Sequence, residues 1–348
     1  MKTLSLPTLA FSIAGSIIGA GFASGQELWQ FFGVFGIKGI IGLVLSLTLF
    51  AALCSIFLLF CKKRGVFSYE NAVFPTSPGI IRKLFALSEN ILFYFLAVIM
   101  TAGAMEVCRI FFPIEVCRII GALFALTVAF FTLFGLGSVT KVFSVFVPLL
   151  TASSAVIFII LVFKNGGLFN FNAGESTDLL NNWLLSSILY VSYSFFASVG
   201  ILAPLSRHIK EKKHTVPAAI LSALLLGIIA FTILFSIALF DSAREAALPM
   251  LYISSKISVA LGGFYAVILL GAMFSASLTS CVAFFEWVEA KITLSRPRKA
   301  LAVFAFSTTA YIFSLFGFKS LISTVYPIFG YIGFVVIISV IFNSFRRK

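Results

Sequence analysis

The stretch Ala14-Gly15-Ser16-Ile17-Ile18-Gly19-Ala20-Gly21-Phe22-Ala23-Ser24-Gly25 decides how this chain can fold. It lies within an apolar run from Ser5 to Phe35, and these 31 residues would form a helix of about 46 Å, longer than the roughly 30 Å hydrocarbon core of a bilayer. Glycine weakens a helix by about 1 kcal/mol relative to alanine, so the glycine cluster marks the place where the run unwinds. Unwound backbone at this depth is tolerated where it lines a cavity. Small-residue helix packing is the alternative interpretation, because Gly15 to Gly19 and Gly21 to Gly25 both have the required spacing.

The composition of the whole chain is that of a membrane protein. Hydrophobic residues make up 61% of the 348 residues and charged residues 11%, against roughly 45–50% and about 25% in soluble proteins. Ten stretches are long and apolar enough to cross a bilayer. They lie near residues 5–35, 37–60, 84–110, 115–136, 140–163, 181–205, 216–240, 259–288, 299–317 and 320–344. The sequence therefore predicts an all-α integral membrane protein with ten transmembrane helices.

The distribution of positive charge predicts the orientation. With a cytoplasmic N-terminus, 18 of the 25 Lys and Arg residues fall on the cytoplasmic side. Cytoplasmic loops are enriched in these residues, so we expect a multi-pass protein of the cell membrane with both termini in the cytoplasm. The net charge of +13 is divided among short clusters between apolar stretches, which favours loops over a nucleic-acid surface. The five cysteines lie mostly inside apolar runs and are predicted to be packing residues.

A short repeat relates the two halves of the chain. The tripeptide Phe22-Ala23-Ser24 recurs as Phe196-Ala197-Ser198, and the offset of 174 residues is half the chain length. Both copies lie in the leading helix of a five-span half, and an odd number of spans makes the second half enter from the opposite face. We therefore predict an inverted 5+5 repeat, typical of secondary transporters, with halves 1–165 and 166–348 in one transmembrane domain and with helices 1 and 6 both broken.

A polar segment interrupts the eighth span. Ser275-Ala276-Ser277-Leu278-Thr279-Ser280 brings several hydroxyl groups to the middle of an apolar helix. Such hydroxyls often donate only to their own helix backbone, which is the alternative interpretation. Together with free carbonyl groups at the first-helix break, they would instead supply the neutral oxygen ligands that a hard cation such as Na⁺ requires.

These two segments carry a family resemblance. The span order and the glycine-rich break resemble the LeuT-type fold of the amino acid–polyamine–organocation superfamily, and Leu278-Thr279-Ser280 resembles the sodium motif of its symporters. The string from Gly15 to Glu27, followed by Trp29-Gln30-Phe31-Phe32, is most similar to the YkvI-type family of bacterial membrane proteins. The resemblance implies a sodium site formed by the carbonyl groups of Gly15, Ile18 and Ala276 and the hydroxyls of Thr279 and Ser280.

The chain departs from the symporter pattern at residues of the second sodium site, so one sodium ion is expected. Phe22 stands where a second sodium site has an asparagine, and the seventh span contains no asparagine. Some proton-coupled relatives carry a lysine in the middle of the fifth helix, whereas this span has only Lys141 at its start. One Na⁺ is therefore the expected cofactor.

The resemblance also implies a solute pocket between the first and sixth helices, with Ala20 and Gly21 presenting backbone groups to a solute carboxylate. The expected substrate-binding residues are Ala20, Gly21, Phe22, Ser192, Ser194, Phe195 and Phe196. Glu27 and Tyr193 are expected gating residues. Glu27 has two alternatives, an interfacial residue or a partner of a cationic substrate, and the rings have the alternative of plain packing.

Enzyme chemistry finds little support in the sequence. His208 and His214 lie in a basic loop, Asp178 and Asp241 lie in loops, and no P-loop pattern is present. We therefore expect a non-enzyme, a sodium-coupled symporter of a small organic solute such as an amino acid or derivative, working by alternating access. The alternatives are a solute-binding receptor or sensor of the same fold and a proton-coupled amino acid transporter. The expected partners are the solute and the lipid bilayer, and no oligomer is required.

Overall fold

The computed structural model describes residues 4–67, 69–73, 79–134, 139–166, 169–171, 174, 176–209, 212–292 and 295–345, which are almost entirely helical. The first half contains α1 (Leu6–Gly15), α2 (Ala20–Ser24), α3 (Gln26–Phe31), α4 (Ile37–Arg64), α5 (Tyr69–Val73), α6 (Gly79–Cys108), α7 (Ile114–Leu133) and α8 (Val139–Asn165). The second half contains α9 (Trp183–Leu205), α10 (Thr215–Ala238), α11 (Pro249–Ile257), α12 (Val259–Glu289), α13 (Arg296–Ser314) and α14 (Phe318–Phe345). Among the described residues the only bridge of β type joins Leu4 to Ile209.

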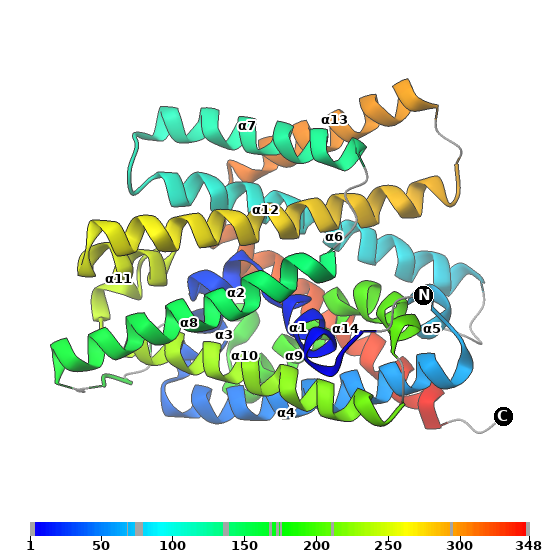
Figure 1. Cartoon of the computed structure of the whole chain (residues 1–348), viewed down its shortest axis with the longest axis horizontal. Helices are drawn as coiled ribbons and strands as arrows, with labels where there is room; N and C mark the ends of the chain where they lie inside the picture. The colour runs from blue at the N-terminus through cyan, green and yellow to red at the C-terminus, as the bar shows by residue number, and fades with distance from the viewer. Residues whose placement is uncertain are drawn as a thin grey trace.

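The long helices lie side by side, roughly along one axis of the molecule (Figure 1). Helices α7 and α13 pack together at one edge, α6 and α12 form the next layer, and α4 packs against α9 and α10 on the other side. Segments α1, α2 and α3 lie between these layers (Figure 1). Because α6 contacts α12 and α4 contacts α9, the predicted halves interleave in one helical body. The division at residue 165 and the inverted repeat remain predictions.

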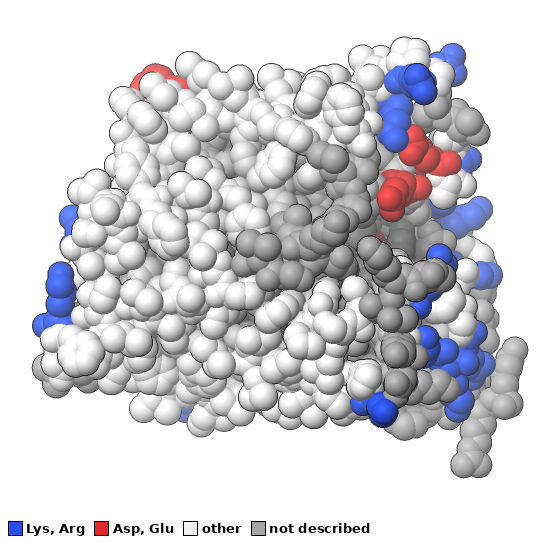
Figure 2. Space-filling view, in the orientation of Figure 1, with Lys and Arg blue, Asp and Glu red and all other residues white. Residues whose placement is uncertain are grey.

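The surface separates charge from apolar area. Figure 2 shows Lys and Arg gathered mainly at the end of the molecule where α1 begins and α14 ends, with a long, nearly uncharged surface between the two ends. Large apolar side chains on that surface are exposed, among them Val259 at 80% and Leu301 at 74%. Exposed apolar side chains over the length of a helix are unfavourable in water and favourable in lipid. The structure is therefore that of a multi-pass membrane protein.

The number of spans differs from the prediction in the described part of the chain. Within the described residues, eight helices are long and apolar enough to cross a membrane: α4, α6, α7, α8 over Phe146–Lys164, α9, α10, α12 and α14. The first predicted span is divided into short helices, and α13 begins with three basic residues in its first four. The ten-helix count is therefore not confirmed.

The predicted break in the first helix is confirmed. Helix α1 ends at Gly15, α2 begins at Ala20, and the residues between them are not helical. A second interruption follows at Gly25, whose φ of 86° ends α2 and precedes α3. Residues other than glycine rarely adopt this left-handed conformation. The run that is too long for one spanning helix is thus divided at its glycines.

The predicted break in the sixth helix is wrong. Helix α9 continues without interruption from Trp183 to Leu205. The hydroxyl of Ser192 donates to the Ile188 carbonyl at 2.8 Å and that of Ser198 to the Ser194 carbonyl at 2.6 Å. Such bonds keep a serine compatible with helical backbone. The segment also has one glycine, Gly200, in place of the glycine cluster of the first helix.

Candidate functional site

The break between α1 and α2 leaves backbone acceptors without helical partners. The regular pattern ends when the Ile17 and Ile18 amides both donate to the Ala14 carbonyl, and it resumes when the Ala23 amide donates to the Gly19 carbonyl. In the described part of the chain, no backbone amide donates to the carbonyl groups of residues 15–18. Carbonyl oxygens inside a protein normally accept a hydrogen bond, whereas these accept none from the backbone. They are therefore available to a ligand.

The polar segment of α12 lies at this break. A cavity of about 60 Å³ is lined by Gly15, Ser16, Ile17, Ile18 and Gly19 from the break, by Ala276, Thr279 and Ser280 of α12, and by residues of α6, α9 and α14. All five residues of the predicted sodium site therefore line one cavity, although they come from segments about 260 positions apart.

The oxygens around this cavity fit a hard monovalent cation. The Thr279 hydroxyl donates to the Ser275 carbonyl at 2.8 Å, which leaves its lone pairs free to act as ligands. Ser280 is buried, and its hydroxyl makes no hydrogen bond within the described residues. Neutral carbonyl and hydroxyl oxygens are ligands of the type that hard cations prefer. The assignment of these residues to sodium remains a prediction.

The residues expected to bind the solute divide into two groups. Ala20, Gly21 and Phe22 are buried on α2, and Ser194 of α9 lines the main cavity. Phe22 and Ser194 also line a small adjoining cavity of about 10 Å³. Ala20 and Gly21 follow the break directly but line neither cavity.

The other three residues face neighbouring helices. Phe195 packs edge-on against Phe57 of α4 with ring centroids 5.6 Å apart, and Phe196 stacks on Phe329 of α14 at 6.1 Å. Ser192 lies against α14, where its carbonyl oxygen would be 2.2 Å from a Cβ added to Gly333. None of the three lines the main cavity. The structure does not bring them together with the solute-binding residues at the break.

Two stacked tyrosines close one side of the cavity. The rings of Tyr193 on α9 and Tyr326 on α14 lie 4.2 Å apart at an angle of 20°, and both line the cavity. Tyr193 was expected as a gating residue from its sequence. Tyr326 was not, because it occurs in an apolar span with no motif around it. The α6 residues Phe93, Leu96 and Met100 also line the cavity and were likewise missed.

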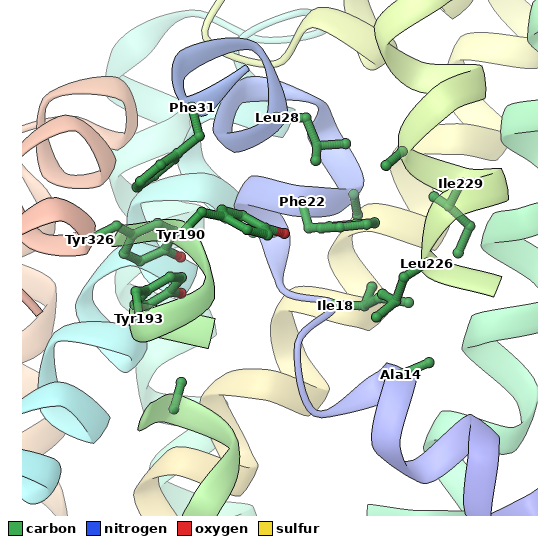
Figure 3. Close-up of a cluster of buried hydrophobic side chains, with 14 of the residues drawn as sticks. Ala14, Ile18, Phe22, Leu28, Phe31, Tyr190, Tyr193, Leu226, Ile229 and Tyr326 are labelled. Atoms are coloured by element: carbon green, nitrogen blue, oxygen red, sulfur yellow. The ribbon is translucent and has the colours of Figure 1, made fainter. Parts of the chain in front are cut away.

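A second group of aromatic side chains lies beside the break. Tyr190 meets Phe31 and Phe32 edge-on, with centroids 5.4 Å and 4.8 Å away. In Figure 3, Tyr190, Tyr193 and Tyr326 lie together on one side of the broken helix, and Ile18, Leu226 and Ile229 lie on the other. These ring contacts therefore pack α9 against the end of α3.

Glu27 is placed differently from a surface gating residue. It lies in the first turn of α3 and its side chain is 1% exposed. A Cβ added to Gly21 would lie 2.7 Å from its Oε2 atom, so the carboxyl rests on the backbone of α2. If ionised, this carboxyl would repel the solute carboxylate that is expected at Gly21, because two like charges would meet there.

Comparison with known proteins identifies the fold. No family model matches the chain. It is 26% identical over 354 aligned positions to the uncharacterised membrane protein YkvI of Bacillus subtilis (strain 168), covering 99% of this chain and 97% of that protein. It is also 23% identical to the uncharacterised protein YyaD of the same organism, covering 97% and 96%.

Three solved structures resemble this chain over nearly its whole length. MhsT in complex with L-phenylalanine superimposes with a TM-score of 0.66 at 18% identity, covering 97% of this chain and 89% of that chain. A substrate-bound, outward-open Na⁺-coupled sialic acid symporter gives 0.62 at 14% identity, covering 95% and 76%. The inward-facing conformation of Mhp1 gives 0.55 at 14% identity, covering 95% and 74%. The chain is therefore similar to the membrane protein YkvI over nearly its whole length, and it has the LeuT-type fold of these solved structures.

Proposed function

We propose that the chain is a sodium-coupled secondary symporter of a small organic solute, an amino acid or a derivative of one, and that it works by alternating access. The observation that carries this proposal is the cavity at the first-helix break. It is lined both by residues 15–18, whose carbonyl groups accept no backbone hydrogen bond from the described residues, and by the hydroxyl-bearing segment of α12. The structural neighbours support it, since they include a Na⁺-coupled symporter and a protein solved with an amino acid.

The proposed ion site uses neutral oxygens. Gly15, Ile18 and Ala276 contribute carbonyl groups, and Thr279 and Ser280 contribute hydroxyls. A bound Na⁺ supplies a positive charge at the point where α1 and α12 meet, and it draws these two elements together. We propose one such ion, because Phe22 replaces the side-chain amide that a second site would need.

The proposed solute site lies beside the ion, around Ala20, Gly21, Phe22 and Ser194. Tyr193 and Glu27 are the proposed gating residues, and the stacked Tyr193 and Tyr326 rings separate the solute from one end of the molecule. Ion and solute then raise each other's affinity by the same factor, because both favour the arrangement in which α1, α9 and α12 enclose the cavity. One chain holds every residue of both sites, so no oligomer is needed. We also propose that the protein lies in the cell membrane with both termini in the cytoplasm.

Sodium-dependent stabilisation tests the ion site directly. A ligand that binds only the folded protein raises its stability by RT ln(1 + [L]/Kd), so the purified wild type should melt at a higher temperature in NaCl than in KCl. Thr279→Ala combined with Ser280→Ala should lose at least half of this difference, since two of five oxygens are gone. The readout is the thermal unfolding midpoint in matched salts.

The matched control is Thr127→Ala on α7. Its hydroxyl makes the same bond to its own helix, to the Leu123 carbonyl at 2.7 Å, but lies away from the cavity. This variant should keep the full difference between NaCl and KCl. An equal midpoint in the two salts for wild type would contradict the sodium site.

Flux separates a transporter from a receptor of the same fold. The full chain is reconstituted into proteoliposomes. Uptake of radiolabelled amino acids is then measured, with L-phenylalanine as the first probe. Accumulation that requires an inward Na⁺ gradient supports the symporter. Saturable binding with no accumulation under any gradient supports the receptor and overturns the transport proposal.

A further inference from the structure

We propose that Glu27 is a proton-binding site, and that its proton is released when the broken first helix moves and water reaches the carboxyl. The protonation is independent of what the protein transports. Its coupling to solute movement rests on the proposed transport function. The site would bring a proton into the transport cycle in addition to sodium.

The carboxyl is buried without a cation. Its Oε1 atom accepts no hydrogen bond from the described residues. The ion pairs found in the described part of the chain join Arg109 to Glu106, Arg244 to Asp241 and Lys299 to Glu289, and none includes Glu27. An unpaired charge inside a membrane protein is strongly unfavourable, so a buried carboxylate needs a neutralising ligand.

The ionisable groups around Glu27 are tyrosines. These are Tyr190 and Tyr193 of α9 and Tyr326 of α14, and tyrosine is uncharged near pH 7. Tyr265 of α12 is occupied, since its hydroxyl donates to the Ala23 carbonyl at 2.7 Å. The three atoms nearest a Cβ added at Gly25 belong to apolar side chains of α10 and α11, namely Ile233, Ile237 and Met250.

One guanidinium group lies beside α3, but it is already paired. Arg244 sits 5.1 Å from the centre of the Trp29 ring, and its Nη2 lies 2.7 Å from Asp241. Its charge is therefore balanced by Asp241. No described side chain around Glu27 supplies a free positive charge.

The space around the carboxyl selects the ligand by size. Glu27 lines neither the cavity at the break nor the small adjoining cavity. Its Oε2 atom and Cβ lie 2.7 Å and 3.2 Å from the position of a Cβ on Gly21, and the tip of Ile322 lies 3.1 Å from the same point. A sodium ion or an ammonium group needs room and several ligands, whereas a proton needs neither. The proton is the cation that this packing accommodates.

The neighbouring hydroxyls suit a protonated carboxyl. The oxygens of Tyr190 and Ser194 are buried and lack hydrogen-bond partners in the described part of the chain, and Tyr190 interacts with both Ser194 and Glu27. Figure 3 shows the Tyr190 hydroxyl directed toward the broken helix. A carboxylic acid can both donate and accept, so it can pair with these hydroxyls after a small shift, which a carboxylate can do only as an acceptor.

The position of Glu27 links the proton to helix movement. It follows Gly25, whose φ of 86° separates α2 from α3, and it touches Gly21 across that turn. Movement of α2 and α3 away from α9 would expose the carboxyl to water, and the acid would release H⁺ to water and leave a hydrated carboxylate. The closed arrangement therefore binds the proton more tightly than the open one, so a rise in pH favours opening.

Infrared spectroscopy tests the bound proton without any solute. The purified full chain at neutral pH should show the carbonyl stretch of a protonated carboxylic acid, shifted in D₂O. Glu27→Gln should lose that band, whereas Glu89→Gln, which changes the other buried acid of the described residues, should retain it. A band that survives in Glu27→Gln, or that is absent from wild type, overturns the proposal.

Hydrogen–deuterium exchange tests the link to movement. After correction for the intrinsic dependence of exchange on pH, peptides covering residues 20–31 should exchange faster at mildly alkaline than at mildly acidic pH in wild type. Glu27→Gln is uncharged throughout and should show no such difference, and Glu27→Asp should restore it. Equal corrected rates in wild type would overturn the link. Both measurements can succeed even if sodium-dependent stabilisation and flux fail, so the two proposals fail separately.

Discussion

At the scale of single residues, Gly21 shows why the first helix carries glycines where it does. Its hydrogen in place of a side chain lets the Glu27 carboxyl rest on the backbone of α2. Both residues are buried, Gly21 on α2, which contacts α6, α11 and α12, and Glu27 on α3, which contacts α9, α10 and α14. In so tight an environment one added methyl group must displace a neighbour, and overpacking of this kind costs about 1–3 kcal/mol.

Gly21→Ala should therefore lower the stability of the protein by about 1–3 kcal/mol. The added methyl would meet Glu27 Oε2 at 2.7 Å. Thermal unfolding of the purified protein measures the change. The control is Gly263→Ala in α12, where a Cβ meets nothing within 4 Å and should gain up to about 1 kcal/mol of helix propensity. A Gly21→Ala variant as stable as the control would show that the carboxyl does not lie on this backbone.

At the scale of elements, the contact between α9 and α14 depends on small residues of α14. Gly330 and Gly333 lie one turn apart and face the carbonyl groups of Leu189 and Ser192. Their lack of side chains allows the two helix backbones to approach closely, as small residues do at helix interfaces in membranes. This approach places Tyr326 against Tyr193 and so forms the aromatic wall of the cavity.

Gly333→Ala adds only one methyl group, but it should disturb the aromatic wall formed by Tyr193 and Tyr326. The new Cβ would stand 2.2 Å from the Ser192 carbonyl oxygen, and backbone cannot rotate away as a side chain can. We expect a loss of about 1–3 kcal/mol in stability. We also expect weaker Na⁺-dependent stabilisation, because α14 and α9 both border the proposed ion cavity. Unfolding midpoints in NaCl and KCl measure both effects. Unchanged midpoints in both salts would contradict the close packing of these helices.

At the scale of the whole molecule, the ends of the helices define two faces. The last turn of α4 carries Lys62, Lys63 and Arg64, and α13 begins with Arg296, Arg298 and Lys299 at the same end of the molecule (Figures 1 and 2). Lys256, in the last turn of α11, belongs to the opposite end. The membrane thus separates the larger basic cluster from a smaller one.

Cysteine labelling in intact cells checks this arrangement. The five native cysteines are all buried, so background labelling should be low. Arg298→Cys and Lys63→Cys should be protected from a membrane-impermeant maleimide and become labelled after permeabilisation, and Lys256→Cys should be labelled in both conditions. Labelling of Lys63→Cys and Lys256→Cys from the same side would contradict the arrangement of the helices across the membrane.

The sequence by itself determined the class of the fold and the break in the first helix. Apolar stretches long enough to cross a bilayer are unfavourable in water. The glycines between Gly15 and Gly25 make the first of these stretches unstable as one continuous helix. Both effects are local and can be read from consecutive residues. The same local reasoning failed in the sixth helix, because Ser192 and Ser198 satisfy their hydroxyls within the helix and leave no reason for a break.

Only the tertiary structure decided which side chains meet at the break. It placed Tyr326 and the α6 residues at the cavity, turned Phe195 and Phe196 toward α4 and α14, and buried Glu27 against Gly21. These outcomes depend on the rotation and approach of helices that are far apart in the chain. In a sequence so uniformly apolar, one face of a helix differs little from another, so the packing of neighbours and not the residue pattern selects the face that lines the site.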